Sequence, residues 1–158
     1  LRVDSADAMR SLGRALGRAL LAPSDKALVI AIRGELGAGK TTLVGGVLNA
    51  LGFGGTARSP TYTLIEPYET LTRRIFHLDL YRLADPQEVE ALGLRDLLTA
   101  DAALLIEWPE RGAGVVPPAD LAISIRYVEA AGVDVRDVEL AAHGSAGSRL
   151  LAAILNVE

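Results

Sequence analysis

The sequence predicts an α/β fold with three layers and a central sheet that contains both parallel and antiparallel strands. Two kinds of observation support this prediction. A continuous apolar run at residues 27–32, ALVIAI, is typical of a strand buried on both faces, and it leads through a glycine-rich turn into a helix. Two later pairs of extended runs, 62–68 with 73–80 and 121–127 with 135–141, lie close enough in the chain to form antiparallel hairpins.

Helices are expected around that sheet, and one more strand within it. Four segments show the spacing of apolar residues or the end signals of helices: residues 5–21, residues 39–51, Pro86 to about Gly93, and residues 148–155. Ser5 or Asp4 can cap the first of these helices, and Asp85 with Glu88 has the pattern of a capping box. The apolar run at 102–108 is expected to be a further buried strand.

Length and composition indicate a single globular domain over residues 1–158, monomeric or weakly oligomeric when alone. Half of the residues are apolar, yet no apolar run reaches the roughly 20 residues that cross a bilayer, so a soluble, cytoplasmic protein is expected. Cysteine is absent and there are only two histidines, which favours a hard metal ion held by oxygen ligands over a zinc site. A net charge of −4 argues against a domain that coats nucleic acid through bulk charge.

Residues 34–43, GELGAGKTTL, carry the strongest functional signal. Gly34, Gly39, Lys40 and Thr41 match G-x-x-x-x-G-K-[ST], the phosphate-binding P-loop. The glycines let successive backbone N–H groups turn toward an anion, and the start of the following helix adds its dipole. The lysine then reaches the β- and γ-phosphates, while the threonine hydroxyl can bind Mg²⁺. The match follows a buried strand and begins a helix, as the motif requires.

A second magnesium-side carboxylate is expected at the end of a neighbouring strand, and Asp79 is the candidate. The alternative is that this residue only caps the following turn. If Tyr68 faces Arg73 across the hairpin, Tyr62 faces Asp79, and Thr61 reaches the same edge of the sheet. Thr61 could then sense the γ-phosphate as part of a switch-like loop.

Glu107 ends another buried strand, at the edge where open α/β sheets bind ligands. It could complete the magnesium shell or orient an attacking water, and the sequence does not separate these roles. Trp108 either packs or shields the ligand. Glu35 is expected to point away from phosphate, which would repel it, and His77 is interpreted as a structural residue of the sheet. Five arginines are plausible anion contacts: Arg58, Arg73, Arg74, Arg82 and Arg111.

Four stretches in this order, GELGAGKTTL, SPTYTLIEPY, HLDLYRLADPQEVEALGL and LIEWPE, resemble the TsaE family, also called YjeE. The resemblance extends from the first helix to about Pro118. It implies a P-loop NTPase-like fold and a weak ATPase that binds ATP and Mg²⁺. It further implies that the protein is required to form threonylcarbamoyladenosine in tRNA. Its partners would be TsaD and TsaB homologues, and its hydrolysis of ATP would reset the complex that they form.

The resemblance implies a nucleotide loop at residues 35–42, a switch-like segment at residues 59–63, and magnesium-linked residues at Thr41, Asp79 and Glu107. Together with the candidates above, these residues make up the predicted site. Asp79, Glu107 and Lys40 would be catalytic, and Thr41, Asp79 and Glu107 would hold the metal. The nucleotide would be bound by the P-loop and two residues outside it: Glu35, Leu36, Gly37, Ala38, Gly39, Lys40, Thr41, Thr42, Thr61 and Trp108.

Two other functions stay open at this point. A small-molecule kinase shares the P-loop but needs an acceptor pocket and an arginine-bearing lid, for which the loop at 111–118 is a poor candidate. A docking module would use ATP only to order the segment around Ser59 for a partner. A GTPase is disfavoured because no N-K-x-D-like segment is present. Direct contact with tRNA is undecided by the sequence.

Overall fold

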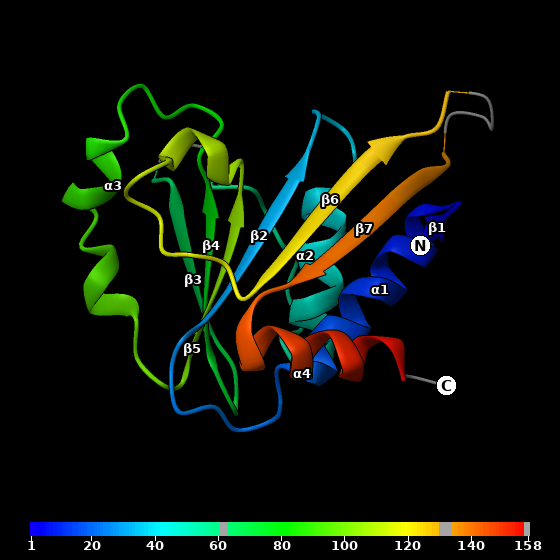
Figure 1. Cartoon of the computed structure of the whole chain (residues 1–158), viewed down its shortest axis with the longest axis horizontal. Coiled ribbons are helices and arrows are strands. Elements are labelled where there is room, and N and C mark those ends of the chain that lie inside the picture. The colour runs from blue at the N-terminus through cyan, green and yellow to red at the C-terminus, as the bar shows by residue number, and fades with distance from the viewer. Residues whose placement is uncertain (61–62, 130–133, 157–158) are drawn as a thin grey trace.

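A seven-stranded sheet crosses the centre of the computed structural model, which describes residues 1–60, 63–129 and 134–156 (Figure 1). The strand order among these residues is β1-β7-β6-β2-β5-β4-β3. The strands are β1 (Arg2–Val3), β2 (Leu28–Gly34), β3 (Ile65–Glu69), β4 (Arg74–Asp79), β5 (Ala102–Glu107), β6 (Leu121–Tyr127) and β7 (Arg136–Ala142). The helices are α1 (Ala6–Ala19), α2 (Lys40–Ala50), α3 (Gln87–Ala91) and α4 (Gly144–Leu155), with 3₁₀ turns η1 (Leu94–Leu97) and η2 (Pro109–Gly112).

The mixed sheet that the sequence predicts is confirmed. β2 lies between β5 and β6 and is parallel to both, and β4 is parallel to β5. The two expected hairpins, β3–β4 and β6–β7, are antiparallel, as is the short β1, which the sequence did not predict and which pairs with β7. Because β2 is central, its residues Ile30 and Ile32 are completely buried.

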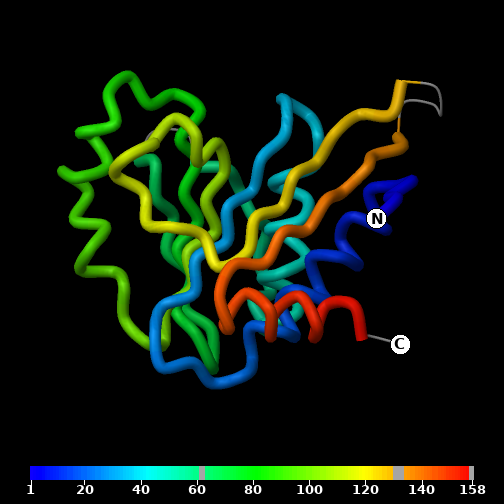
Figure 2. The backbone as a smooth tube through the Cα atoms, viewed as in Figure 1, coloured from blue at the N-terminus to red at the C-terminus, as the bar shows by residue number. Residues whose placement is uncertain are grey.

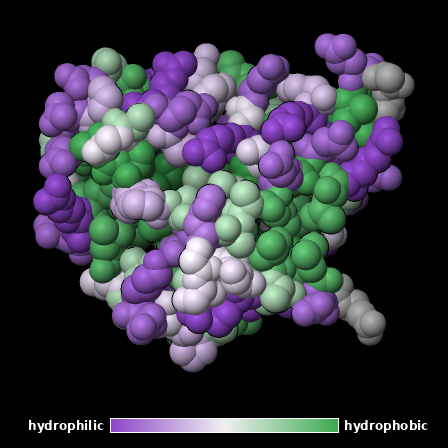
Figure 3. Space-filling view, viewed as in Figure 1, coloured by the Kyte–Doolittle hydropathy of each residue, from purple (hydrophilic) through white to green (hydrophobic). Residues whose placement is uncertain are grey.

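Helices cover the two faces of the sheet unequally. On one face α1, α2 and α4 enclose the larger core, while the other face carries, among the described residues, only α3, η1 and the chain around η2 (Figures 1 and 2). The prediction of three layers is therefore confirmed, although the second helical layer is thin, since α3 has five residues. Apolar surface remains on the α3 side (Figure 3), where the lining of a groove of about 350 Å³ includes Leu94, Leu98, Val115 and Pro117.

Close contact between helix backbones holds α2 against α1. A Cβ on Gly13 of α1 would lie 2.1 Å from the Leu43 carbonyl oxygen, and a Cβ on Gly46 of α2 would lie 2.3 Å from that of Arg10. Only glycine permits this approach, because any side chain at either position would push the helices apart. Since α2 begins at the P-loop, the same contact fixes the position of the loop.

The predicted hairpin register is wrong by two residues. Tyr68 pairs with Ile75 rather than Arg73, and the Asp79 N–H donates to the Leu64 carbonyl at 3.1 Å. The turn is tighter than expected because Thr70 closes it: its hydroxyl donates to the Arg73 carbonyl at 2.8 Å. The predicted neighbour of Asp79, Tyr62, and the switch residue Thr61 lie outside the described residues.

Helix ends agree with the predicted caps, and the last helix is longer than predicted. Ser5 accepts the Ala8 N–H at 3.1 Å, and the Glu88 carboxylate accepts the Asp85 N–H at 3.0 Å, as in a capping box. α4 begins at Gly144 instead of residue 148, since its small first residues pack directly on the chain before β6. None of the helices in the described ranges has the length and apolar character that a membrane span requires.

Candidate functional site

The turn between β2 and α2 has the backbone shape that the glycine pattern predicts. Gly37 and Gly39 adopt φ angles of 75° and 111°, which residues with a side chain disfavour. Gly39 is also the N-cap of α2, so the unpaired N–H groups of the first helical turn face this loop. Such a turn, in front of a helix N-terminus, is suited to bind an anion through main-chain amides.

A cavity of about 230 Å³ opens over this turn and gathers most of the predicted site. The residues of the prediction that line it are Leu36, Gly37, Gly39, Lys40, Thr41, Thr42, Asp79, Glu107 and Trp108. Ser59 and Tyr81 complete the lining. The three predicted sources, the P-loop and the ends of two parallel strands, therefore meet at one place.

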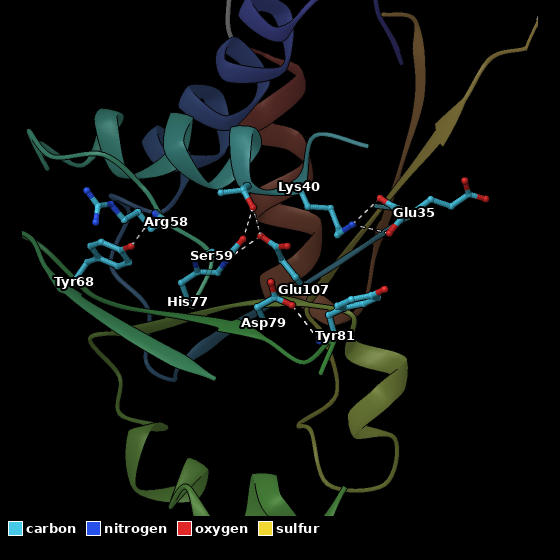
Figure 4. Close-up of polar contacts among 11 residues, drawn as sticks. Glu35, Lys40, Arg58, Ser59, Tyr68, His77, Asp79, Tyr81 and Glu107 are labelled. Atoms are coloured by element: carbon cyan, nitrogen blue, oxygen red, sulfur yellow. Dashed lines mark hydrogen bonds and ion pairs between the residues drawn. The ribbon is translucent and has the colours of Figure 1, made fainter. Parts of the chain in front are cut away.

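Two residues of the predicted nucleotide loop do not line this cavity. Ala38 is 2% exposed and packs in the core, and Glu35 lines a neighbouring cavity of about 560 Å³. Figure 4 shows the Glu35 carboxylate extending away from Lys40, as expected for a group that phosphate would repel. Ala38 and Glu35 can thus serve a ligand in this cavity only through main-chain groups.

The Lys40 ammonium lies within the P-loop. Its Nζ donates to the carbonyl oxygens of Gly34 at 2.7 Å and Glu35 at 2.8 Å (Figure 4), and lies 4.5 Å from the centre of the Trp108 ring. Burial lowers the pKa of Lys40, against the opposing effect of nearby carboxylates. A phosphate group in the cavity would offer this buried cation the negative charge that main-chain carbonyls only partly provide.

The Thr41 hydroxyl links the P-loop helix to two other segments. Thr41 donates to Glu107 Oε1 at 3.1 Å, and its oxygen lies 2.6 Å from the Ser59 hydroxyl. Thr41 is on the first turn of α2, Glu107 ends β5, and Ser59 belongs to the segment between α2 and β3. The predicted magnesium-binding hydroxyl is therefore in direct contact with one of the predicted carboxylates.

Asp79 and Glu107 are neighbours across the parallel strands β4 and β5. Burial raises the pKa of Asp79, although the Tyr81 N–H donates to its Oδ1 at 3.0 Å. Within the described ranges, no group of three or more His, Cys, Asp or Glu residues gathers as a metal site. Two carboxylates and a hydroxyl suit Mg²⁺, which keeps several waters and takes its other ligands from substrate phosphates.

Aromatic side chains form one wall of the cavity. Trp108 adopts a positive φ of 56°, an unusual conformation for a bulky residue, and its main-chain N–H donates to the Ile32 carbonyl at 3.3 Å. Its ring lies 5.0 Å from that of Tyr81, and the Arg111 guanidinium stands over both rings. Arg111 therefore lies near the cavity, and its contact with an anion stays a prediction.

The structure places three residues differently from what the sequence suggests. Arg73, predicted as an anion contact, is buried elsewhere and donates to main-chain carbonyls of Leu20, Ala22 and Ala100. Tyr127, in a part of the sequence without a motif, donates from its hydroxyl to the Leu36 carbonyl of the P-loop at 2.7 Å. His77, interpreted as structural, contacts Glu107; its place two residues before Asp79 in a strand could have indicated this.

A buried parallel strand, a glycine turn closed by lysine and threonine, and carboxylates at two adjacent strand ends define the class of P-loop α/β proteins. A solved structure supports this fold. The crystal structure of Bacillus subtilis YdiB superposes with a TM-score of 0.72 at 24% identity, over 98% of this chain and 92% of that one.

The sequence comparisons identify the family. The family model described as threonylcarbamoyl adenosine biosynthesis protein TsaE matches residues 3–136. A TsaE of Haemophilus influenzae is 44% identical over 133 residues, 84% of this chain and 82% of the relative. A TsaE of Bacillus subtilis is 35% identical over 117 residues, 74% and 71% of the two chains. The chain therefore belongs to the TsaE family, named for the biosynthesis of threonylcarbamoyladenosine in tRNA, and the predicted resemblance is confirmed.

Proposed function

We propose that this protein binds ATP with Mg²⁺ in the P-loop cavity and hydrolyses it slowly in support of threonylcarbamoyladenosine formation. One observation carries the proposal: Lys40, Thr41, Asp79 and Glu107, from three separate elements, line the same cavity in front of the α2 N-terminus. Each group suits one part of a magnesium-bound triphosphate.

The chemistry of each residue in the cavity indicates its role in binding the nucleotide and the metal. The amides of the P-loop and the Lys40 ammonium hold the β- and γ-phosphates, which requires Lys40 to leave the Gly34 and Glu35 carbonyls. Thr41, Asp79 and Glu107 would hold Mg²⁺ directly or through its waters, and the metal would neutralise charge on the phosphates. Glu107 has the further option of orienting the attacking water.

Slow hydrolysis follows from the cations around the cavity. Lys40 is the only cationic side chain among the described residues of its lining, and Arg111 stacks on aromatic rings beside it. An arginine that stabilises the transition state contributes about 10³–10⁵ in rate, so its absence leaves a weak ATPase. We propose that TsaD and TsaB homologues are the partners, and that ATP hydrolysis resets their complex. Family membership supports this partnership.

The kinase alternative loses support from the segment it would need as a lid. Pro109 and Gly112 are buried, and Val115 and Val116 pack against the core on the α3 side. A segment held by these contacts is a poor candidate for a lid that closes over an acceptor. One observation favours the docking alternative: the Thr41 hydroxyl contacts the Ser59 hydroxyl. Through this contact, a ligand bound at Thr41 would order the segment before β3.

Nucleotide binding is tested by calorimetric titration of ATP with Mg²⁺ into the protein and into Lys40→Ala. Binding should be lost in this variant. Lys26→Ala is the matched control, because it removes the only other lysine, which pairs with Asp120 instead of lining the cavity. Retained affinity in Lys40→Ala would contradict the proposed phosphate site.

Hydrolysis is tested separately, with and without purified TsaD and TsaB homologues. The partners should raise the rate, and Glu107→Gln should bind ATP but hydrolyse it at least about tenfold more slowly. Hydrolysis at the same rate in Glu107→Gln would contradict the catalytic role of Glu107. Nucleotide-dependent binding of the partners without any hydrolysis would support the docking module instead.

A further inference from the structure

His77 is a buried imidazole that the proposed chemistry leaves without a role. It lies in β4 two residues before Asp79, and alternate residues of a strand face the same side of a sheet. Its side chain is 0% exposed. Its register partner in β5 is Leu105, two residues before Glu107. His77 and Glu107 therefore share the face of the sheet that α2 covers.

One oxygen of Glu107 makes two contacts. His77 Nε2 lies 2.9 Å from Glu107 Oε1, and the Thr41 hydroxyl donates to the same oxygen at 3.1 Å (Figure 4). A carboxylate oxygen accepts hydrogen bonds, so the tautomer that fits this contact carries its proton on Nε2 and donates it to Oε1. The carboxylate is thereby held from α2 on one side and from β4 on the other, in a side chain that is 3% exposed.

The other ring nitrogen of His77 argues against a purely structural role. Nδ1 is buried and has no hydrogen-bond partner within the described part of the chain. A buried polar atom left unpaired costs stability, and an apolar residue of similar size would avoid that cost. The bond from Nε2 to Glu107 is thus the interaction that gives an imidazole an advantage at this position.

We propose that His77 is a positioning residue for Glu107, holding Oε1 so that Oε2 serves the metal or the attacking water. The inference rests on the proposed function, since His77 acts only through Glu107. The side chain of His77 is enclosed and does not line the cavity, so it does not touch the nucleotide. Without it, the one hydrogen-bond partner left to the Glu107 carboxylate among the described residues would be Thr41, whose oxygen also contacts Ser59 and is needed for Mg²⁺.

Small displacements at such a site have large effects on rate, because a shift of about 1 Å can lower turnover about 100-fold. The test compares three variants of the full chain. His77→Gln keeps an amide N–H that reaches toward Glu107, His77→Asn carries the same amide on a side chain one methylene shorter, and His77→Leu has no donor. Each is also made together with Glu107→Gln. Turnover, ADP affinity without magnesium, and melting temperature are measured for all.

His77→Leu and His77→Asn should lower kcat about 10- to 100-fold while changing ADP affinity less than about twofold, and His77→Gln should recover most of the rate. In the Glu107→Gln background the same changes should add less than about twofold, since residues that act as one unit are not additive. If the leucine variant does not fold, the comparison of glutamine with asparagine decides.

Wild-type turnover in His77→Asn, equal losses in the glutamine and asparagine variants, or full additivity with Glu107→Gln would each overturn the inference. Failure of the proposed function gives a different result, because Glu107→Gln by itself would then hydrolyse ATP at the wild-type rate.

Discussion

Replacing Gly46 by alanine tests the contact that fixes the P-loop helix against α1. A Cβ on Gly46 would lie 2.3 Å from the Arg10 carbonyl oxygen. Gly45, its neighbour in α2, is the matched control, because a Cβ there would meet Ala57 Cβ at an ordinary 3.6 Å. Both substitutions exchange glycine for alanine within one helix, so both gain up to about 1 kcal/mol of helix propensity.

The steric cost separates the two variants. At Gly46 the new Cβ would lie about 1 Å closer to the Arg10 carbonyl oxygen than 3.4 Å, the shortest ordinary van der Waals contact. The obstacle is main chain, which cannot rotate aside, so α1 and α2 must move apart. Overpacking of this kind costs about 3 kcal/mol at the upper end of its usual range. The net change is then a loss of about 2 kcal/mol in Gly46→Ala and a gain of up to about 1 kcal/mol in Gly45→Ala.

Thermal denaturation of the nucleotide-free protein measures the difference. For a domain of this size 1 kcal/mol corresponds to about 2–4 °C, so the melting temperature should fall by about 4–8 °C in Gly46→Ala and rise by about 2–4 °C in Gly45→Ala. ATP affinity should fall only in Gly46→Ala, because moving α2 moves the P-loop. Equal melting temperatures in the two variants would refute the reasoning.

Three further predictions follow from the geometry. Burial raises the pKa of Asp79, so the stability that this carboxyl contributes to the nucleotide-free protein is lost as pH rises through that raised value, a loss that Asp79→Asn lacks. The melting temperature of Asp79→Asn relative to wild type, in EDTA, should therefore increase between about pH 4 and pH 8, and a constant difference would contradict the assignment. Arg73→Leu removes the donor to three main-chain carbonyls and should cost about 3 kcal/mol in urea denaturation, against about 0.5 kcal/mol for the exposed neighbour in Arg74→Leu. Tyr127→Phe removes the donor to Leu36 and should weaken ATP binding about fivefold in titrations, without lowering the melting temperature by more than about 2–4 °C; unchanged affinity would show that this bond does not support the P-loop.

The P-loop could be predicted from the sequence because its determinants are local. The glycines that allow positive φ, the lysine and the threonine lie within eight consecutive positions, between a buried strand and a helix. Asp79 and Glu107 could also be predicted to meet, since parallel strands end at one edge of a sheet. The register of β3 against β4 could not, because it depended on how Thr70 closes the turn.

The sequence by itself determined the α/β class, the P-loop and the strand-end carboxylates, since these depend on short-range pattern and on one general rule of sheet topology. Only the tertiary structure decided that His77 contacts Glu107 and that the Tyr127 hydroxyl donates to the Leu36 carbonyl of the P-loop. These bonds join residues 30 and 91 positions apart, and a hydrogen bond over such a separation depends on how the whole chain packs. Apolar periodicity indicates which face of a strand is buried, but not which polar group of a distant segment will contact that strand.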